Sequence, residues 1–331
     1  MHYGGIERIV DSLARELQSR GHCVGLVAHV DSTCPVEKLY PWPCLHPQSA
    51  MAHIRNQVLL ARAVGDFHAD LVHSFSRLGY LLPLLPMQIP KVMSYQRFTG
   101  GRQIHWGARL SRGTLHFTGC SQFIVNMGAR SGGVWNVVPN FIDLAKFNFR
   151  ATVSPDAPLV FLSRVERIKG AHTAISIAKR VGIRLIIAGN RAESGLEAEY
   201  WQHEIEPELD NDRISYIGPV DDHKKNELLG SAVALLVPIE WDEPFGIVFS
   251  EALACGTPVI ATPRGALPEI VRPGIEGFLI SCEAEGCRAV ERLSEISREA
   301  CRRRVEERFS SKIVTDQYIA LYHQMVAGND K

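Results

Sequence analysis

The stretch Glu243-Pro-Phe-Gly-Ile-Val-Phe-Ser-Glu251 decides the fold. It places two carboxylates eight residues apart across a Pro-Phe-Gly turn. Helix formers continue to Gly256, and Thr257–Thr262 follows with the pattern of a strand. We therefore expect Glu243 in a loop at a helix N-terminus and Glu251 two turns inside that helix. Because the first amides of a helix have no partner within it, the turn after Gly246 is predicted to bind an anion.

The two carboxylates admit two interpretations. An anion site with an acid at each end suits a ligand that carries both phosphate and sugar hydroxyls. In the simpler interpretation, Glu243 starts a helix because the macrodipole favours an acid there, and Glu251 lies on the surface. The motifs on either side of this stretch favour the first interpretation.

Those motifs resemble one protein family. They are Gly256–Ala261 and Gly265–Val271 downstream, and Phe161–Gly170, Val138–Asp143, Gly21–Val24 and Gly4–Val10 upstream. Together they resemble the retaining nucleotide-sugar glycosyltransferases of the GT-B fold, of the family 4 type with its E-x7-E motif. The resemblance spans nearly the whole chain in the expected order, and it is most specific in the C-terminal half.

The resemblance implies an α/β protein with two Rossmann-like, doubly wound domains facing a cleft. The predicted elements agree, because strands and helices alternate along the chain. We expect an N-terminal acceptor-side domain over residues 1–145 and a nucleotide-sugar-binding domain over 146–311. A last helix at about 312–328 is expected to cross back to the first domain. The segment holding Pro35, Pro41, Pro43 and Pro47 is predicted to be a loop.

One strand of the family pattern is missing at the start of the chain. In the family a first strand precedes the glycine loop, whereas this chain starts at Met1-His-Tyr-Gly-Gly5. That strand lies at the centre of the N-terminal sheet, so its neighbours are expected to lack backbone partners here. Either the start lies inside a longer gene, which we favour, or another segment fills the gap.

Composition excludes several classes of protein. The chain has 331 residues, of which 46% are hydrophobic and 22% charged, as in ordinary globular domains. No apolar run approaches the roughly 18 residues of a membrane span, and the N-terminus lacks the pattern of a signal peptide. None of the eight cysteines forms a Cys-x-x-Cys pair, which argues against a zinc cluster or redox motif. We expect a cytoplasmic protein with reduced thiols.

The net charge of zero conceals an asymmetry between the two halves. Residues 1–150 hold 15 Lys and Arg against 8 Asp and Glu, and the remainder has the opposite excess. The stretch from Arg97 to Arg130 contains no acid. A basic first half suits an anionic acceptor or an anionic membrane surface, and the alternative is a solvated face with no partner. Nothing resembles a nucleic-acid-binding module, so we expect no nucleic acid partner.

The resemblance assigns roles to individual residues. Cleavage of a nucleotide sugar at the anomeric carbon releases a diphosphate, so the site must stabilise charge growing there. By resemblance the catalytic candidates are Arg164 and Lys169, which bind the diphosphate, and Glu243, which contacts hydroxyls of the transferred sugar. By resemblance Glu251 accepts hydrogen bonds from the ribose hydroxyls of the donor. The expected donor-binding residues are the three catalytic candidates together with Gly5, Pro219, Gly246, Ile247, Val248 and Glu251.

No cofactor and no metal are expected. The family is metal-independent, and we expect no Asp-x-Asp motif holding a divalent cation against the diphosphate. Cationic side chains and helix amides would do that work instead. The donor is expected to be a nucleoside-diphosphate sugar, most simply a UDP-linked one. The acceptor is expected to be a carbohydrate, a lipid-linked molecule or another small molecule.

The acceptor side departs from the family pattern. Many members carry a catalytic-site histidine after the fourth strand of the first domain, where Gln96 stands here. Glutamine can bind a sugar hydroxyl but cannot act as an acid or base. His73, at the end of the preceding strand, is the candidate substitute, although a histidine at a strand end is more often structural.

Three other functions remain open from the sequence. A protein that binds a nucleotide sugar without transferring it would fit Gln96 and the missing strand. A nicotinamide-dependent oxidoreductase would need Gly-x-Gly-x-x-Gly between a strand and a helix, and the chain has no such loop. A noncatalytic scaffold would not need the diphosphate cations and the two glutamates to converge.

Overall fold

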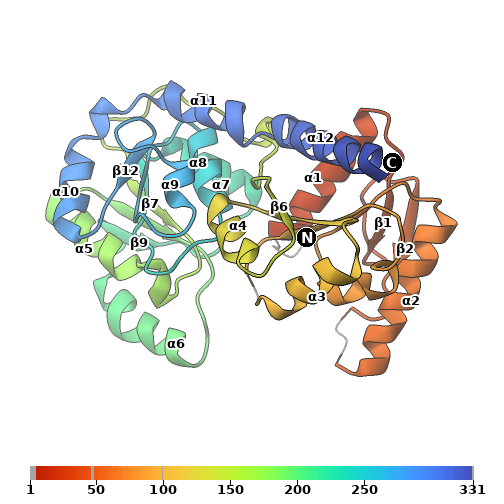
Figure 1. Ribbon diagram of the computed structural model, residues 1–331. Helices are drawn as coiled ribbons and strands as arrows, with labels where there is room; N and C mark the ends of the chain where they lie inside the picture. Colours follow the sequence, from red (N-terminus) through yellow and green to blue (C-terminus); the bar gives the residue numbers. More distant parts are fainter. Residues whose placement is uncertain (1–4, 46–47, 99, 330–331) are drawn as a thin grey trace. The chain divides into compact units, whose positions relative to one another are not determined.

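The computed structural model describes residues 5–45, 48–98 and 100–329, which group into two compact units (Figure 1). Unit 1 comprises Met1–Asn140 and Ser311–Lys331, and unit 2 comprises Phe141–Ser310. The sequence analysis placed the domain boundary five residues later, at 145/146, and the start of the returning helix at 312. Both units are built from parallel strands and helices, so the α/β class and the two-domain organisation are as predicted.

Unit 2 contains one parallel sheet, ordered β12-β11-β10-β7-β8-β9. Its strands are β7 (Leu159–Leu162), β8 (Leu185–Ala188), β9 (Ile214–Tyr216), β10 (Ala234–Val237), β11 (Val259–Ala261) and β12 (Gly277–Leu279). The chain starts at β7, adds β8 and β9 on one side, and then returns to add β10 to β12 on the other. The strand order therefore reverses between β7 and β10. Loops that leave two such strands diverge, and α/β sheets bind their ligands at this point.

The strands of unit 2 are short apolar runs because helices cover both faces of the sheet. Every residue of β7 and β10 is buried. On one side α5 (Ala171–Val181) packs against α10 (Glu283–Glu291), and on the other α8 (Ile247–Ala254) packs against α7 (Asp222–Ser231) and α11 (Arg298–Arg308) (Figure 1). Shorter helical segments lie in the connections: η2 (Leu144–Lys146), η3 (Arg167–Lys169), α6 (Leu196–Tyr200), η4 (Trp201–Ile205), η5 (Glu206–Glu208), α9 (Leu267–Ile270) and η6 (Leu293–Glu295).

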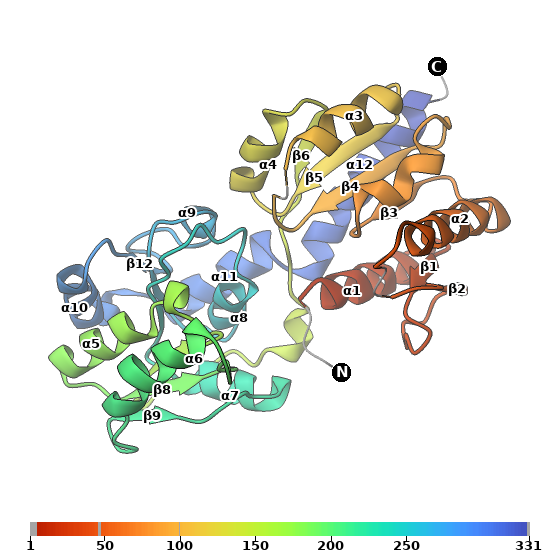
Figure 2. The same cartoon turned by 90° about the horizontal axis from the view of Figure 1, so that it is seen from below.

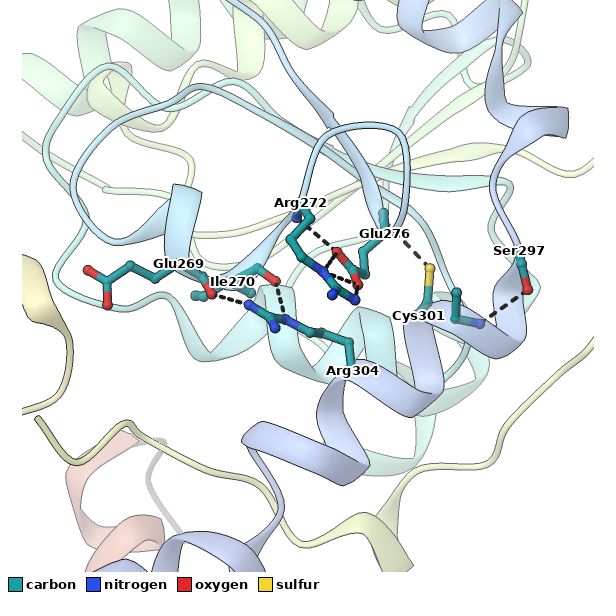
Figure 3. Close-up of polar contacts among 8 residues, drawn as sticks. Glu269, Ile270, Arg272, Glu276, Ser297, Cys301 and Arg304 are labelled. Carbon is teal, nitrogen blue, oxygen red and sulfur yellow. Dashed lines mark hydrogen bonds and ion pairs between the residues drawn. The ribbon is translucent and has the colours of Figure 1, made fainter.

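Helix α11 fixes the loops of unit 2 through its arginines. Arg304 donates hydrogen bonds to the carbonyls of Glu269 and Ile270, at 2.6 and 3.2 Å, and so caps the last turn of α9 (Figure 3). Beside it, Arg272 pairs with Glu276, whose side chain is fully buried (Figure 3). Arg298, at the start of α11, donates to the carbonyls of Arg150, Gly230 and Ala232, at 2.7–3.0 Å. Arg304 thus holds the short helix α9 in place, and Arg298 holds the segments around α7 and before β7.

The described strands of unit 1 form two parallel sheets instead of one. Strand β1 (Gly25–Ala28) pairs with β2 (Lys38–Pro41), and a second sheet has the order β3-β4-β5-β6. The second sheet consists of β3 (Val72–Ser74), β4 (Lys91–Tyr95), β5 (Leu115–Gly119) and β6 (Val134–Val137). Among the described residues the end strands β1, β2, β3 and β6 each have one edge without a strand partner. The missing central strand stays a prediction. Strand β2 lies within the segment predicted to be a loop, and Pro41 is tolerated as the last residue of this edge strand.

The helices of unit 1 include one from the far end of the chain. They are α1 (Gly5–Ser19), α2 (Ala50–Asp66), α3 (Arg102–Leu110), α4 (Gln122–Ala129) and α12 (Ser311–Asn329), with the 3-10 segment η1 (Leu78–Leu84) against α2. Helix α12 lies beside α1, where Arg20 pairs with Asp316 at 2.8 Å (Figure 2). Its apolar face buries Leu321 and Met325 against Val92 of β4. This contact makes the C-terminal helix part of the first unit.

Candidate functional site

Two of the catalytic candidates meet where the strand order of unit 2 reverses. Lys169 ends η3, after β7, and Glu243 lies in the loop between β10 and α8. Lys169 Nζ lies 2.8 Å from Glu243 Oε2, and both side chains are largely buried. Trp241 Nε1 donates to the same oxygen at 3.0 Å, and the Lys169 ammonium lies 4.6 Å from the centre of the Trp241 ring. The structure thus joins two loops 74 residues apart through one charged pair.

Two glycines lie close to Glu243. Gly246 has φ +82°, a conformation that L side chains rarely adopt. Gly265 has φ +58°, and a Cβ there would lie 2.2 Å from the Glu243 carbonyl oxygen. The amide of Ala266 donates to that same oxygen at 2.8 Å. Because α11 fixes α9 and α9 follows Ala266, the position of Glu243 is determined by the packing of unit 2.

The second glutamate of the motif lies deeper. Glu251 is in α8, one turn from its N-terminus and not two turns as predicted, because the helix starts only at Ile247. Its carboxylate forms an ion pair with Lys225 of α7, and both side chains are almost entirely buried. Burial and the nearby Glu251 charge raise the pKa of the Cys255 thiol to about 12. The alternative that Glu251 is a surface residue is therefore wrong.

The first turn of α8 supplies backbone donors beside these carboxylates. Gly246 caps the helix, and Ile247 and Val248 are its first two residues. The amides of a first helical turn have no acceptor within the helix and favour anions. This geometry keeps both residues as donor-binding candidates.

Three other predicted donor residues remain, Arg164, Pro219 and Gly5. Arg164 follows β7 but is 62% exposed, and its Nη1 lies 2.5 Å from Glu166 Oε1. Pro219 is exposed after the edge strand β9, in a loop tied to the end of β8 by the hydrogen bond from the Gly189 amide to the Gly218 carbonyl. Gly5 begins α1 in unit 1, and its neighbour Gly4 is outside the described residues. Their donor-binding roles stay predictions.

The acceptor-side candidates of unit 1 have different surroundings. His73 Nδ1 lies 2.6 Å from the Tyr322 hydroxyl, and Nε2 lies 2.6 Å from Ser94 Oγ, so both ring nitrogens are engaged. Desolvation by the surrounding side chains lowers the pKa of His73 to about 3, which keeps the ring neutral. These contacts favour a structural histidine over a substrate-binding one. Gln96 lies at the bend after β4 and is partly exposed, and its acceptor-side role stays a prediction.

Sequence reasoning missed two residues of the site. Trp241 precedes Glu243 by two positions, and no pattern in the sequence distinguishes a ligand-facing indole from a core one. Lys225 carried a readable signal, because it lies three and four residues before Leu228 and Leu229, which are buried in the same helix. A lysine at that spacing is on the buried face of a helix and needs a partner there.

An Asp-x-Asp triplet does occur, contrary to expectation, at Asp210-Asn211-Asp212. It lies before β9, at the opposite end of the strand from the loops that carry Lys169 and Glu243. Asp210 Oδ1 accepts hydrogen bonds from the amides of Asp212, Arg213 and Ile214, at 2.8–3.0 Å, and these bonds lower the pKa of the carboxyl group. The triplet therefore shapes a turn. Elsewhere in the described residues, no three His, Cys, Asp or Glu side chains are grouped to hold a metal ion.

A hollow of about 480 Å³ lies elsewhere on unit 2. Its lining includes Arg150, Asp156, Pro158 and Arg184. These residues precede β7 and β8, at the amino ends of the strands. The hollow is therefore at the opposite end of the sheet from the Lys169–Glu243 pair.

Comparison with known families matches each unit to a glycosyltransferase profile. Residues 146–310 match glycosyl transferases group 1, and residues 3–146 match glycosyltransferase family 4. Together the two matches cover nearly the whole chain in the expected order. The chain belongs to the GT-B glycosyltransferases of the family 4 type. The oxidoreductase and scaffold interpretations have no support from these matches.

Relatives of known name match parts of the chain. The chain is 32% identical over 181 residues to a D-inositol 3-phosphate glycosyltransferase of Mycobacterium bovis, which covers 51% of this chain and 37% of that protein. A counterpart from Mycobacterium marinum is 34% identical over 127 residues, covering 37% of this chain and 27% of the relative. The chain thus spans about a third of the length of the curated relatives it matches.

Solved structures show the same fold over nearly the whole chain. AviGT4, a glycosyltransferase involved in avilamycin A biosynthesis, superposes with a TM-score of 0.71 at 25% identity, covering 98% of this chain and 91% of that one. HepE of Anabaena, solved in complex with UDP-glucose, has a TM-score of 0.71 at 18% identity, with 97% and 96% covered. Among the described residues, no helix is both long enough and apolar enough to cross a membrane.

Proposed function

We propose that this chain transfers a sugar from a nucleoside-diphosphate sugar, UDP-linked, with retention at the anomeric carbon and without a metal ion. The observation that carries the proposal is the convergence of Lys169 and Glu243 where the strand order of unit 2 reverses. Family membership supports the reaction class, and HepE, a protein of the same fold, holds UDP-glucose. Retention and UDP are taken from the family resemblance.

In this reaction the anomeric C–O bond of the donor breaks and its electron pair leaves with the diphosphate. A new C–O bond forms to an acceptor hydroxyl, whose proton passes to the departing diphosphate. Lys169 lies at the N-terminal end of α5, so its ammonium and the amides at the start of α8 supply positive charge to the departing oxygens. Glu243 accepts hydrogen bonds from hydroxyls of the transferred sugar. Because Lys169 and Glu243 pair with each other, a donor needs to divide this pair between its phosphate and its sugar.

A screen of nucleotide sugars by thermal shift tests the donor assignment. A ligand that binds only the folded state raises the apparent melting temperature, so UDP-sugars should raise it more than GDP- or ADP-sugars do. UDP release and the anomeric configuration of the product, read by NMR, then test transfer and retention. If no nucleotide sugar raised the melting temperature, the proposed donor site would be wrong.

Metal independence has a separate test. The positive charge that a divalent cation would bring to the diphosphate is already present in Lys169. UDP affinity measured by calorimetry should be the same with and without EDTA. Affinity that collapses on chelation would contradict this part of the proposal.

The acceptor side is proposed to meet an anionic membrane surface through α3. Arg102 and Arg109 are exposed on this helix beside Trp106 and Leu110, whose exposed fractions are 56% and 48%. An exposed tryptophan and leucine among arginines suit the interface of an anionic bilayer. The sequence from residue 71 to residue 142 contains no Asp or Glu that would repel it.

Vesicle co-sedimentation tests this surface. Reversing Arg102 and Arg109 to Glu should abolish binding to anionic vesicles and leave UDP affinity unchanged, because the donor residues that carry charge lie in unit 2. The matched control reverses Arg55 and Arg62, which are exposed on α2. Wild-type binding should weaken at high salt, since screening acts within about 10 Å at 0.1 M. If the protein bound zwitterionic vesicles as well as anionic ones, or bound neither, α3 would be a solvated surface without an anionic membrane partner.

Gln96 supports a second candidate, a protein that binds the nucleotide sugar without transferring it. The side chain has no acid–base function, and His73 has no free ring nitrogen to replace the missing histidine. The two candidates differ in turnover. Donor binding with no release of UDP, across a panel of acceptors and in water alone, would favour binding without transfer.

A further inference from the structure

The Lys225–Glu251 pair is unusual for its place in the fold. Lys225 lies in the first turn of α7, where four of the five residues from Asp221 to Lys225 are exposed, yet its side chain is only 1% exposed. It crosses to α8 and ends at the Glu251 carboxylate. Its ammonium also lies 3.4 Å from Asp222 Oδ1 and 5.5 Å from the centre of the Phe147 ring. The cation is thus enclosed between two helices and an aromatic face.

Burial of this pair is not explained by stability. Removing two charges from water costs more than a well-packed apolar pair would, so ion pairs at such places are poor contributors to the folded state. The pair fixes one end of a single carboxylate, however, since a charged hydrogen bond is short and directional. The other oxygen of Glu251 is then held in one orientation. That oxygen belongs to a residue of the candidate donor site.

We propose that Lys225 is a positioning residue that orients Glu251 for the ribose hydroxyls of the donor. This inference rests on the proposed function, in which Glu251 is the ribose acceptor. Lys225 itself does not touch the ligand, because its ammonium is sealed behind Glu251 and Phe147. Its effect therefore depends on whether the ligand carries ribose hydroxyls. A residue that only stabilised the fold would affect every nucleotide alike.

Calorimetry with UDP and 2′,3′-dideoxy-UDP separates these cases on the full chain. Lys225→Met should lower the affinity for UDP by about tenfold or more, which is the effect of losing a hydrogen bond to a charged group. The affinity for dideoxy-UDP should change by less than about twofold, the usual limit for independent sites. The matched control is Lys224→Met, which alters the exposed neighbour and should change neither affinity.

A double-mutant cycle gives a second readout. Lys225→Met combined with Glu251→Gln removes both charges, and it should bind UDP no more weakly than Glu251→Gln alone, because the lysine acts only through the carboxylate. If Lys225→Met does not fold, this double variant and Lys225→Arg carry the test. Lys225→Arg keeps the charge but changes its geometry, and its loss should again be confined to UDP.

The outcomes distinguish the inference from the proposed function. Equal weakening of UDP and dideoxy-UDP by the Lys225 variants, or additive losses in the cycle, would overturn the positioning role. If Glu251→Gln itself failed to discriminate between the two nucleotides, the ribose assignment of Glu251 would fail first. If Glu251→Gln lowered the affinity for UDP more than that for dideoxy-UDP, but neither Lys225→Met nor Lys225→Arg did so, only the Lys225 proposal would be wrong.

Discussion

The polar residues near the carboxyl ends of the two large parallel sheets are partnered in opposite ways. In unit 2 they form ion pairs between separate loops or helices, Lys169 with Glu243 and Lys225 with Glu251. In unit 1 they are neutral and bonded to one another: His73 contacts Ser94, and Ser94 lies 2.5 Å from Thr118 Oγ1. Tyr322 of α12 completes the unit 1 group.

The difference teaches how a strand-end residue acquires a role. A charged pair can exchange one partner for a ligand of matching charge, since a phosphate replaces the carboxylate at a lysine. A saturated neutral network offers no such exchange, because each hydrogen bond lost to a ligand leaves another group unsatisfied. Both sheets carry polar residues near the same end, but of these two groups only the one in unit 2 consists of ion pairs that a charged ligand can divide. Changes in unit 2 should therefore alter turnover, and changes in the network of unit 1 should alter stability.

The largest effect is expected from Lys169→Ala. The change removes the charge aimed at the leaving diphosphate, and turnover should fall by about 100–1000-fold, as when one preorganised donor is lost. UDP release from the donor measures it. Lys179→Ala, on the exposed side of α5, is the matched control and should keep full activity. If the Lys169 variant kept wild-type turnover, Lys169 would not be the cation that stabilises the leaving diphosphate.

A smaller effect is expected in unit 1 from acid. The unfolded chain protonates His73 near its ordinary pKa of about 6.5, whereas the folded ring stays neutral until about pH 3. Between pH 6.5 and pH 3 the unfolded state binds more protons than the folded state. The free energy of unfolding therefore decreases as the pH is lowered, by up to about 1.4 kcal/mol per pH unit. Urea unfolding at pH 7, 6 and 5 should show a shallower fall for His73→Gln. His323→Gln, at an exposed site on α12, serves as the control. If the free energy of unfolding of the His73 variant fell with pH as steeply as that of the wild type, His73 would not be the buried neutral group described above.

The smallest effect is expected from Trp241→Phe. This change keeps a ring over Lys169 but removes the N–H that donates to Glu243. Loss of one hydrogen bond to a charged group predicts about a tenfold lower kcat/KM. Trp201→Phe, in the core of unit 2, controls for the loss of an indole whose N–H has no hydrogen-bond partner among the described residues. A variant that lost stability but not activity would assign Trp241 to the fold and not to the site.

Local patterns predicted unit 2 better than unit 1. The alternating strands and helices around its sheet could be predicted from local patterns, and the donor loops from Gly246 and the two glutamates, because short-range spacing determines a strand followed by a turn and a helix. The sequence could not show that His73 is bonded to Tyr322, since 249 residues separate them and only tertiary packing joins them. Strand β2 was missed for a related reason. Its pairing with β1 overrides the loop propensity of its prolines.

The return of α12 also sets an order of events during synthesis. Unit 1 is assembled from two segments with all of unit 2 between them, and α12 supplies Tyr318 and Tyr322 to its interior. Unit 2 is continuous, and its residues have all been synthesised before Ser311 is added. On the ribosome, where domains fold as units, unit 2 can therefore fold first although it comes second in the chain. Until α12 packs, Val92 of β4 lacks its contacts with Leu321 and Met325, so the nascent chain exposes apolar surface there.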